Sequence, residues 1–126
     1  MSKVVLWASD LAAQINFYSL LFDVAPGFVG DGFAEVSSEL NSVLLHVLPE
    51  EYRAVTPLTA QLTHQTEVAI KPVFTVNDLA TAEKRIAGTL GTFSAGTISY
   101  GNFIYQDVVD PEGNVIQLQQ LLVEPL

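Results

Sequence analysis

The chain has 126 residues and a formal net charge of −9, with 14 acidic and only 5 basic residues. This length predicts a single domain, and the acidic balance argues against binding to nucleic acid or to anionic membranes. The absence of cysteine excludes disulfides and thiolate chemistry. Hydrophobic residues make up 49% of the sequence, yet no apolar run approaches the roughly 20 residues of a membrane helix. We therefore expect a filled core and a buried subunit interface.

The N-terminal part predicts a strand followed by a helix. Lys3–Ser9 is rich in β-forming residues, and the residues before it have neither the charged nor the apolar region of a signal peptide, which predicts a cytoplasmic protein. Asp10 is suited to cap a helix, and the helix is expected to end between Asp23 and Pro26. Its predicted apolar face comprises Leu11, Ala12, Ile15, Tyr18, Leu21 and Phe22.

Short strands complete the first unit. Gly27–Val29 and Phe33–Val36 flank Gly30-Asp31-Gly32, which predicts a hairpin. Ser42–Leu48 predicts the last strand of this unit. Residues 50–66 show little periodicity, and we expect them to connect the first unit to the second.

The C-terminal half predicts the same order of elements. The predicted strands are Glu67–Val76, Gly91–Ile98, Asn102–Val109 and Val115–Leu122, and a helix capped by Asp78 runs from Leu79 to Leu90. A turn at 110–114 joins the last two strands, because Asp110 can accept hydrogen bonds from turn amides, Pro111 presets φ and Gly113 tolerates a positive φ. Glu112 in this turn is interpreted as a solvated charge.

The opening of each half is an internal repeat. Lys3–Gln14 aligns without a gap with Lys71–Ala82. Identical residues occupy equivalent positions at Lys3/Lys71, Val5/Val73, Asp10/Asp78, Leu11/Leu79 and Ala12/Ala80. The repeat predicts two tandem β-α-β-β-β modules, about 1–49 and 67–122, within one domain of residues 1–126, and hence an α+β fold.

This organisation resembles the vicinal oxygen chelate superfamily, which includes glyoxalase I, bleomycin-resistance proteins and extradiol dioxygenases. The resemblance rests on both modules opening with a strand into Asp-Leu-Ala, on Asp110–Gln117 before the last strand, and on Asn16-Phe-Tyr18 in the first helix. It implies curved mixed sheets around a concave cavity. It also implies a homodimer, in agreement with the apolar composition.

In metal-dependent members of the superfamily, His, Gln or Glu ligands lie on the concave face of the first and last strand of each module. Carried over by the motif, these positions fall on Lys3, Leu44, Lys71 and Gln117, and a shift of two residues would replace Leu44 by His46. Neither leucine nor a protonated lysine has a lone pair to donate, whereas a divalent metal needs three or four donors. We therefore expect no metal and no other cofactor, as in the metal-free, bleomycin-resistance-like members.

Strand alternation predicts which side chains face the cavity. If Val4, Leu6 and Ala8 pack on the helix, the opposite face of the strands carries Lys3, Val5, Trp7, Leu44, His46, Lys71, Val73, Thr75, Gln117 and Gln119. Tyr105 is expected near the mouth, with Tyr100 and Phe103. Such an amphipathic pocket would suit a flat organic ligand with a few hydrogen-bonding or acidic groups.

Several of these residues have a simpler structural interpretation. Trp7 is either a stacking platform or a core residue. Lys3 and Lys71 either form a pair of cations for a carboxylate or phosphate, or reach into water from strand ends. His46 fits a satisfied, partly buried histidine better than a ligand or base. The polar pair Gln117 and Gln119 is the least expected in an apolar strand, and we expect at least one of them to contact a ligand.

Three functions are compatible with this sequence. The first is a metal-free protein that sequesters an organic ligand, such as an antibiotic or another natural product, at a dimer interface. The second, which is the main alternative, is a divalent-metal-dependent lyase, isomerase or dioxygenase. Its metal ligands would be displaced from the superfamily positions to residues such as His46, Gln117 and Glu67. The third is a relative that binds no ligand and is retained for dimerisation.

Overall fold

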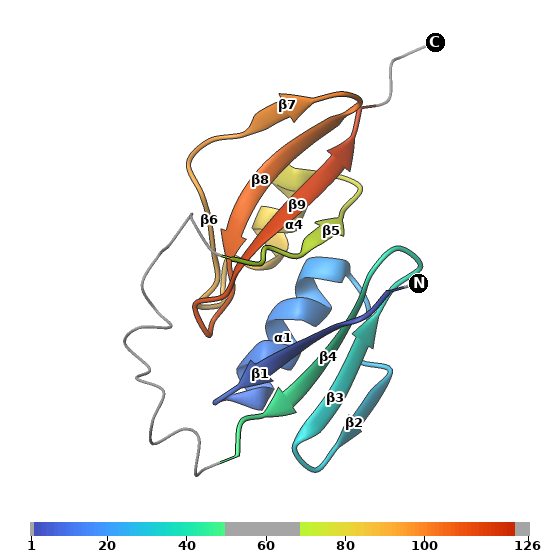
Figure 1. Cartoon of the computed structure of the whole chain (residues 1–126), viewed down its shortest axis with the longest axis vertical. Coiled ribbons are helices and arrows are strands. Elements are labelled where there is room, and N and C mark those ends of the chain that lie inside the picture. The colour runs from blue at the N-terminus through green and yellow to red at the C-terminus, as the bar shows by residue number, and fades with distance from the viewer. Residues whose placement is uncertain (1, 50–68, 123–126) are drawn as a thin grey trace.

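The computed structural model describes residues 2–49 and 69–122, which form two modules that each place a helix against one sheet (Figure 1). Module one consists of β1 (Val4–Ala8), α1 (Leu11–Phe22), β2 (Phe28–Gly30), β3 (Phe33–Ser37) and β4 (Ser42–Val47). Module two consists of β5 (Val73–Thr75), α4 (Leu79–Arg85), β6 (Thr92–Phe93), β7 (Ile98–Tyr100), β8 (Phe103–Val109) and β9 (Val115–Leu121). The predicted α+β fold is confirmed. The predicted connection at 50–66 lies outside the described residues.

The two sheets have the same topology. The first has strand order β1-β4-β3-β2, and the second has β5-β9-β8-β6 with β7 also paired to β8. In each sheet the strand before the helix pairs in parallel with the last strand, and the remaining pairs are antiparallel. This shared topology confirms the predicted repeat at the level of structure. Of the helices in the described ranges, none has the length and hydrophobicity that crossing a bilayer requires.

The strand predicted at Gly91–Ile98 is two strands instead of one. Both β6 and β7 pair with β8, and the chain bends between them at residues 94–97. Backbone pairing with β8 extends to Ser94, whose amide donates to the Asp107 carbonyl (2.9 Å). Side chains add to it, because Gln106 Nε2 donates to the Ser94 carbonyl (2.7 Å) and Ser94 Oγ donates to the Gly96 carbonyl (3.4 Å). Glycine also weakens a strand by its conformational freedom. Small residues therefore interrupt this strand, which was predicted to be continuous from Gly91 to Ile98.

Both helices begin at the predicted caps. Asp10 accepts a hydrogen bond from the Ala13 amide (3.1 Å), and Asp78 accepts one from the Thr81 amide (2.8 Å). The Thr81 hydroxyl and amide together lower the pKa of the Asp78 carboxyl. The helix predicted to reach Leu90 ends earlier, at Arg85, because turn and side-chain bonds around Thr89 replace helical ones.

One further boundary differs from the prediction, and another lies where it was predicted but has a different cause. The strand predicted at Glu67–Val76 is confined, within the described residues, to Val73–Thr75, since Pro72 has no N–H to pair. The first helix ends because Asp23 adopts a left-handed conformation (φ 57°), so proline is not the direct cause of its end.

Helix α1 packs against both modules. In Figure 1, β1 crosses in front of α1 and α4 lies behind β8 and β9. Phe17 and Tyr18 are fully buried in a core shared by the two modules, and the Tyr18 and Phe22 rings contact Phe74 with centroid distances of 6.1 and 5.1 Å. The predicted helix face is thus rotated, since Gln14 and Phe17 are also fully buried.

Asp110 joins the two modules through a buried hydrogen-bond network. Its Oδ1 accepts from the Glu112 and Asn114 amides (both 2.9 Å), which confirms the predicted turn chemistry. Its Oδ2 accepts from the Tyr18 hydroxyl (2.7 Å), Gln14 Nε2 (3.0 Å) and Asn114 Nδ2 (2.9 Å). The turn aspartate of module two therefore also anchors the helix of module one.

The prediction that Glu112 is a solvated charge is wrong. Glu112 is only 7% exposed, and its carboxylate accepts hydrogen bonds from the Ser9 amide (2.7 Å) and the Asp10 amide (3.1 Å). These amides lie at the start of α1, where unpaired N–H groups and the helix dipole favour a negative charge. A glutamate in a turn of module two thus extends the cap of the helix in module one.

We expect Tyr18 to make stability depend on alkaline pH. Burial, followed by the Asp110 carboxylate, raises the pKa of the Tyr18 hydroxyl well above its ordinary value. The folded state therefore holds this proton more tightly than the unfolded state. That stabilisation is complete below the unfolded pKa of about 10 and is lost as the pH rises above it.

The measurement is the free energy of unfolding in urea for wild type and Tyr18→Phe at about pH 8 and about pH 11. The free energy of unfolding of wild type, relative to that of Tyr18→Phe, should fall by about 1.4 kcal/mol for each pH unit above about 10. Tyr100→Phe, which removes an exposed hydroxyl, is the control and should change in parallel with wild type. Equal pH dependence for Tyr18→Phe and wild type would contradict the prediction.

Candidate ligand-binding site

Each sheet has one face on the core and one open face. In β1, Ala8 is buried and Val4 and Leu6 pack against the core, whereas Val5 and Trp7 are about half exposed. The face assignment predicted from alternation is therefore confirmed in this strand. In β5 the same pattern leaves Val73 exposed beside the buried Phe74.

The open face of the first sheet carries a row of rings. The centroid of His46 lies 5.6 Å from that of Trp7 and 4.6 Å from that of Phe33, and Phe33 lies 5.6 Å from Phe28. We call these four residues the aromatic row. Trp7 is thus a surface residue that contacts neighbouring rings, which leaves its predicted role as a stacking platform open to test and excludes the core interpretation.

Leu44 and Lys3 also lie on this open face. Leu44 is in register with Val5 on one side and Glu35 on the other. Lys3 Nζ pairs with Glu35 Oε2 at 2.7 Å, and both side chains are partly exposed. The Lys3 ammonium therefore has a carboxylate partner from its own sheet.

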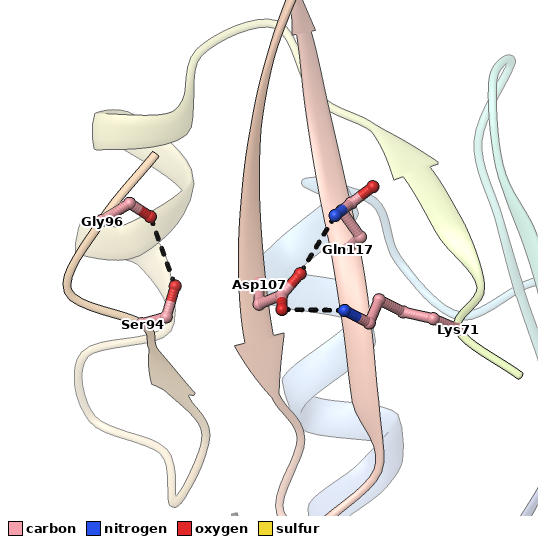
Figure 2. Close-up of polar contacts among 5 residues, drawn as sticks. All are labelled: Lys71, Ser94, Gly96, Asp107 and Gln117. Atoms are coloured by element: carbon pink, nitrogen blue, oxygen red, sulfur yellow. Dashed lines mark hydrogen bonds and ion pairs between the residues drawn. The ribbon is translucent and has the colours of Figure 1, made fainter. Parts of the chain in front are cut away.

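On the second sheet, Lys71, Asp107 and Gln117 form what we call the polar triad (Figure 2). The Lys71 ammonium lies 2.9 Å from Asp107 Oδ2, and Gln117 Nε2 donates to Asp107 Oδ1 at 3.1 Å. Strand register explains this grouping, because Asp107 of β8 lies directly opposite Gln117 of β9. The Lys71 and Asp107 side chains are 26% and 17% exposed, so the pair is only partly shielded from water.

Two hollows lie next to the triad. The main hollow, of about 540 Å³, is lined by Val73, Ile98, Tyr100, Tyr105, Gln117 and Gln119. The adjoining hollow, of about 310 Å³, shares Ile98, Tyr105 and Gln117 and is also lined by Lys71, Asp107 and the bend between β6 and β7. Gln119 is held in place by donating to Thr75 Oγ1 at 2.8 Å. Together the hollows combine apolar walls with amide, hydroxyl and paired charged groups.

The predicted site residues fall into two groups. Lys3, Trp7, Leu44 and His46 lie on the first sheet, and Lys71, Val73, Tyr105, Gln117 and Gln119 lie on the second. The sequence predicted that these residues line one pocket from both modules, whereas the two hollows beside the triad are lined by the second module alone. The face of each residue was thus predictable, but the separation of the two groups was not.

Sequence reasoning missed Asp107 as a member of the site. The signal was present, because Asp107 follows Tyr105 by two residues on one strand and must share its face. Both predicted lysines pair with carboxylates, Lys3 with Glu35 and Lys71 with Asp107. Two roles were predicted for these lysines, a pair of cations for a ligand or water-exposed strand ends. Neither prediction included a carboxylate partner.

No protein-family model matches the sequence, and no curated protein sequence matches it. Solved structures do match. A glyoxalase/bleomycin resistance protein from Albidiferax ferrireducens T118 has a TM-score of 0.65 at 18% identity, covering 99% of this chain and 98% of that one. A glyoxalase-related enzyme from Fulvimarina pelagi has a TM-score of 0.67 at 16% identity, covering 100% and 91%.

A glyoxalase/bleomycin resistance protein/dioxygenase family enzyme from Burkholderia phytofirmans PsJN has a TM-score of 0.64 at 17% identity, covering 96% and 98%. The chain has the glyoxalase/bleomycin-resistance fold. The resemblance predicted from the repeat and its motifs is therefore confirmed for the fold. At these identities the glyoxalase/bleomycin-resistance fold does not specify a function, which has to be argued from the site itself.

The side chains at the four metal-ligand positions predicted from the resemblance do not fit a divalent metal. Of Lys3, Leu44, Lys71 and Gln117, only the glutamine offers a lone pair at neutral pH. Asp107, the carboxylate beside Gln117, already accepts from the Lys71 ammonium and from Gln117 Nε2. Across residues 2–49 and 69–122, no three His, Cys, Asp or Glu side chains gather as metal ligands would.

Two of the three displaced ligands predicted for the alternative enzyme lie on different sheets. His46 lies on the first sheet and contacts rings, whereas Gln117 lies on the second sheet and contacts Asp107. Glu67 lies outside the described residues.

Proposed function

We propose that the protein binds a small organic ligand without a metal, in the hollows on the open face of the second sheet. The observation that supports this most directly is the lining of the main hollow. The apolar side chains of Val73 and Ile98 and the ring of Tyr105 lie beside the amides of Gln117 and Gln119. Ligand sites typically combine such apolar walls with a few polar groups that fix orientation.

The proposed activity is sequestration. The polar groups at the hollow hold one another by hydrogen bonds, and the aspartate of the triad already accepts from two donors. Two of the similar structures are described as a glyoxalase/bleomycin resistance protein and as a glyoxalase/bleomycin resistance protein/dioxygenase family enzyme. By extension, an antibiotic or another natural product is the class of ligand that we propose.

We further propose that the protein acts as a homodimer in the cytoplasm. Exposed apolar side chains lie on both open faces, with Val5, Trp7 and Phe28 on the first and Ile98 and Tyr100 on the second. Covering them with a second copy would bury apolar area of the kind that drives association. In this arrangement the aromatic row would belong to the subunit interface or complete the binding site.

Native mass spectrometry of protein purified without chelator tests this function. We expect a dimer that carries no metal and retains a small organic mass. Supplementation with zinc, manganese or iron followed by dialysis is the control for metal lost in purification. About one divalent metal retained per subunit would contradict the proposal and favour the alternative lyase, isomerase or dioxygenase.

Variants on the two sheets locate the ligand in the same experiment. Tyr105→Ala should weaken retention of the organic mass by about tenfold or more, as expected for the loss of an aromatic contact. Phe28→Ala tests the aromatic row of the other sheet, and Leu90→Ala, which truncates an exposed apolar side chain between α4 and β6, is the control. Loss of the ligand from Phe28→Ala alone would move the proposed site to the first sheet.

A further inference from the structure

We infer that the hollow of the second sheet selects neutral ligands with an amide-like edge over anionic ligands, and that Asp107 sets this selectivity. The inference rests on the proposed function, since it assigns a ligand class to the same site. It differs from what the sequence suggests, because two lysines at repeat-equivalent positions predict an acidic ligand.

The first argument is the charge at the hollow. An anion that approaches the Lys71 ammonium also approaches the Asp107 carboxylate, whose oxygen is 2.9 Å away. Attraction and repulsion of similar size largely cancel for such a ligand. Asp107 cannot easily turn away, because Gln117 donates to its other oxygen (Figure 2).

The second argument is the polarity of the remaining groups. Gln117 donates its amide to Asp107, and Gln119 donates its amide to Thr75. Within the described residues, neither side-chain carbonyl oxygen accepts a hydrogen bond, and both belong to residues that line the main hollow. Two carbonyl oxygens call for N–H or O–H donors on the ligand, and a carboxylate has no donor to offer.

The third argument is the shape of the ligand that these groups imply. The Lys71 ammonium retains N–H groups beyond the one directed at Asp107, and these can donate to a ligand carbonyl. A carboxamide, lactam, urea or heterocyclic edge carries a donor and an acceptor side by side. Ile98 and Tyr100 supply apolar surface for the body of the ligand. A flat neutral molecule with such an edge matches this set of groups.

The test uses three probes of the same shape and different charge: naphthamide, naphthoate and naphthamidine. Binding of each to the full chain is measured by calorimetry at neutral pH. Wild type should bind naphthamide about tenfold or more tightly than naphthoate, the difference expected when a charged group cannot find a net partner. Asp107→Asn leaves Lys71 uncompensated and should strengthen naphthoate binding by about tenfold or more.

Two further variants make the result specific. Lys71→Met leaves Asp107 uncompensated and should shift the preference toward naphthamidine, which keeps the inference testable if Asp107→Asn fails to fold. Glu83→Gln makes the same change in net charge as Asp107→Asn at an exposed position on α4, behind the sheet, and should leave all three affinities unchanged.

The outcomes separate the inference from the proposed function. If wild type binds naphthoate as tightly as naphthamide, the inference is overturned and the binding function stands. An unchanged preference in both Asp107→Asn and Lys71→Met would also overturn it, as would an equal shift in Glu83→Gln. If none of the probes binds to wild type or to any variant, the inference is overturned, and retention of an organic mass in native mass spectrometry decides separately on the proposed function.

Discussion

Replacement of Asp110 by alanine is expected to lower the free energy of unfolding by about 4 kcal/mol or more. The carboxylate is only 2% exposed and accepts hydrogen bonds from two turn amides and three side chains. Truncation would leave the buried Tyr18 hydroxyl and Gln14 amide without their acceptor. Each buried polar group that loses its partner costs about 1–3 kcal/mol.

Urea denaturation followed by circular dichroism measures this effect, with Asp31→Ala as the matched control. Asp31 is an exposed turn aspartate in module one, and its removal should change stability by no more than about 0.5 kcal/mol. In the Asp110→Ala background, Tyr18→Phe should cost little further, because its hydroxyl has already lost Asp110. A cost of less than about 1 kcal/mol for Asp110→Ala would show that the network does not stabilise the fold.

The Asp110 network also shows which parts of the fold the sequence could predict. The caps at Asp10 and Asp78 and the turn at 110–114 rest on interactions within a few residues, and all were predictable. The bonds from Glu112 to the start of α1 span 102 and 103 residues. Capping rules read local sequence, so a cap supplied by the other module could not be recognised from it.

The candidate site divides in the same way. Alternation predicted correctly that Val5 and Trp7 leave the core, because it depends only on strand geometry. The ion pair of Lys71 with Asp107 joins residues that are 36 positions apart in the chain. The register of β8 against β9 then places Asp107 opposite Gln117. Local patterns predict which face of a strand a residue lies on, but they do not predict which residue of another strand it contacts. The charge balance at the hollow was therefore visible only in the structure.

Adding a single methyl group at Gly91 is expected to destabilise the fold strongly. A Cβ atom at this position would lie 2.6 Å from Cδ2 of Phe17 and closer still to Cε2, well inside van der Waals contact. The Phe17 ring is fully buried and packs edge-on against Tyr18 at a centroid distance of 4.9 Å, so it has no open direction in which to move. Gly91→Ala should therefore lower the free energy of unfolding by about 3 kcal/mol.

Gly88→Ala is the matched control, because a Cβ there meets nothing within 4 Å. It should be neutral or stabilise the protein by up to about 1 kcal/mol, through the lower entropy of the unfolded chain. If both glycine variants changed stability equally, steric conflict with Phe17 would not be the cause.

Phe17→Leu provides the decisive comparison, since the smaller side chain leaves room for a methyl group at Gly91. In that background Gly91→Ala should cost about 1 kcal/mol or less, a coupling of the size found between residues in contact. Because Phe17 precedes Tyr18 on α1 and Gly91 lies in module two, this coupling would measure how closely the helix is fitted between the modules. Additive costs would mean that the modules separate slightly to admit the methyl group. In that case we expect the Asp110 network to weaken in Gly91→Ala. The pH dependence of the free energy of unfolding that Tyr18 causes above about pH 10 should then become smaller.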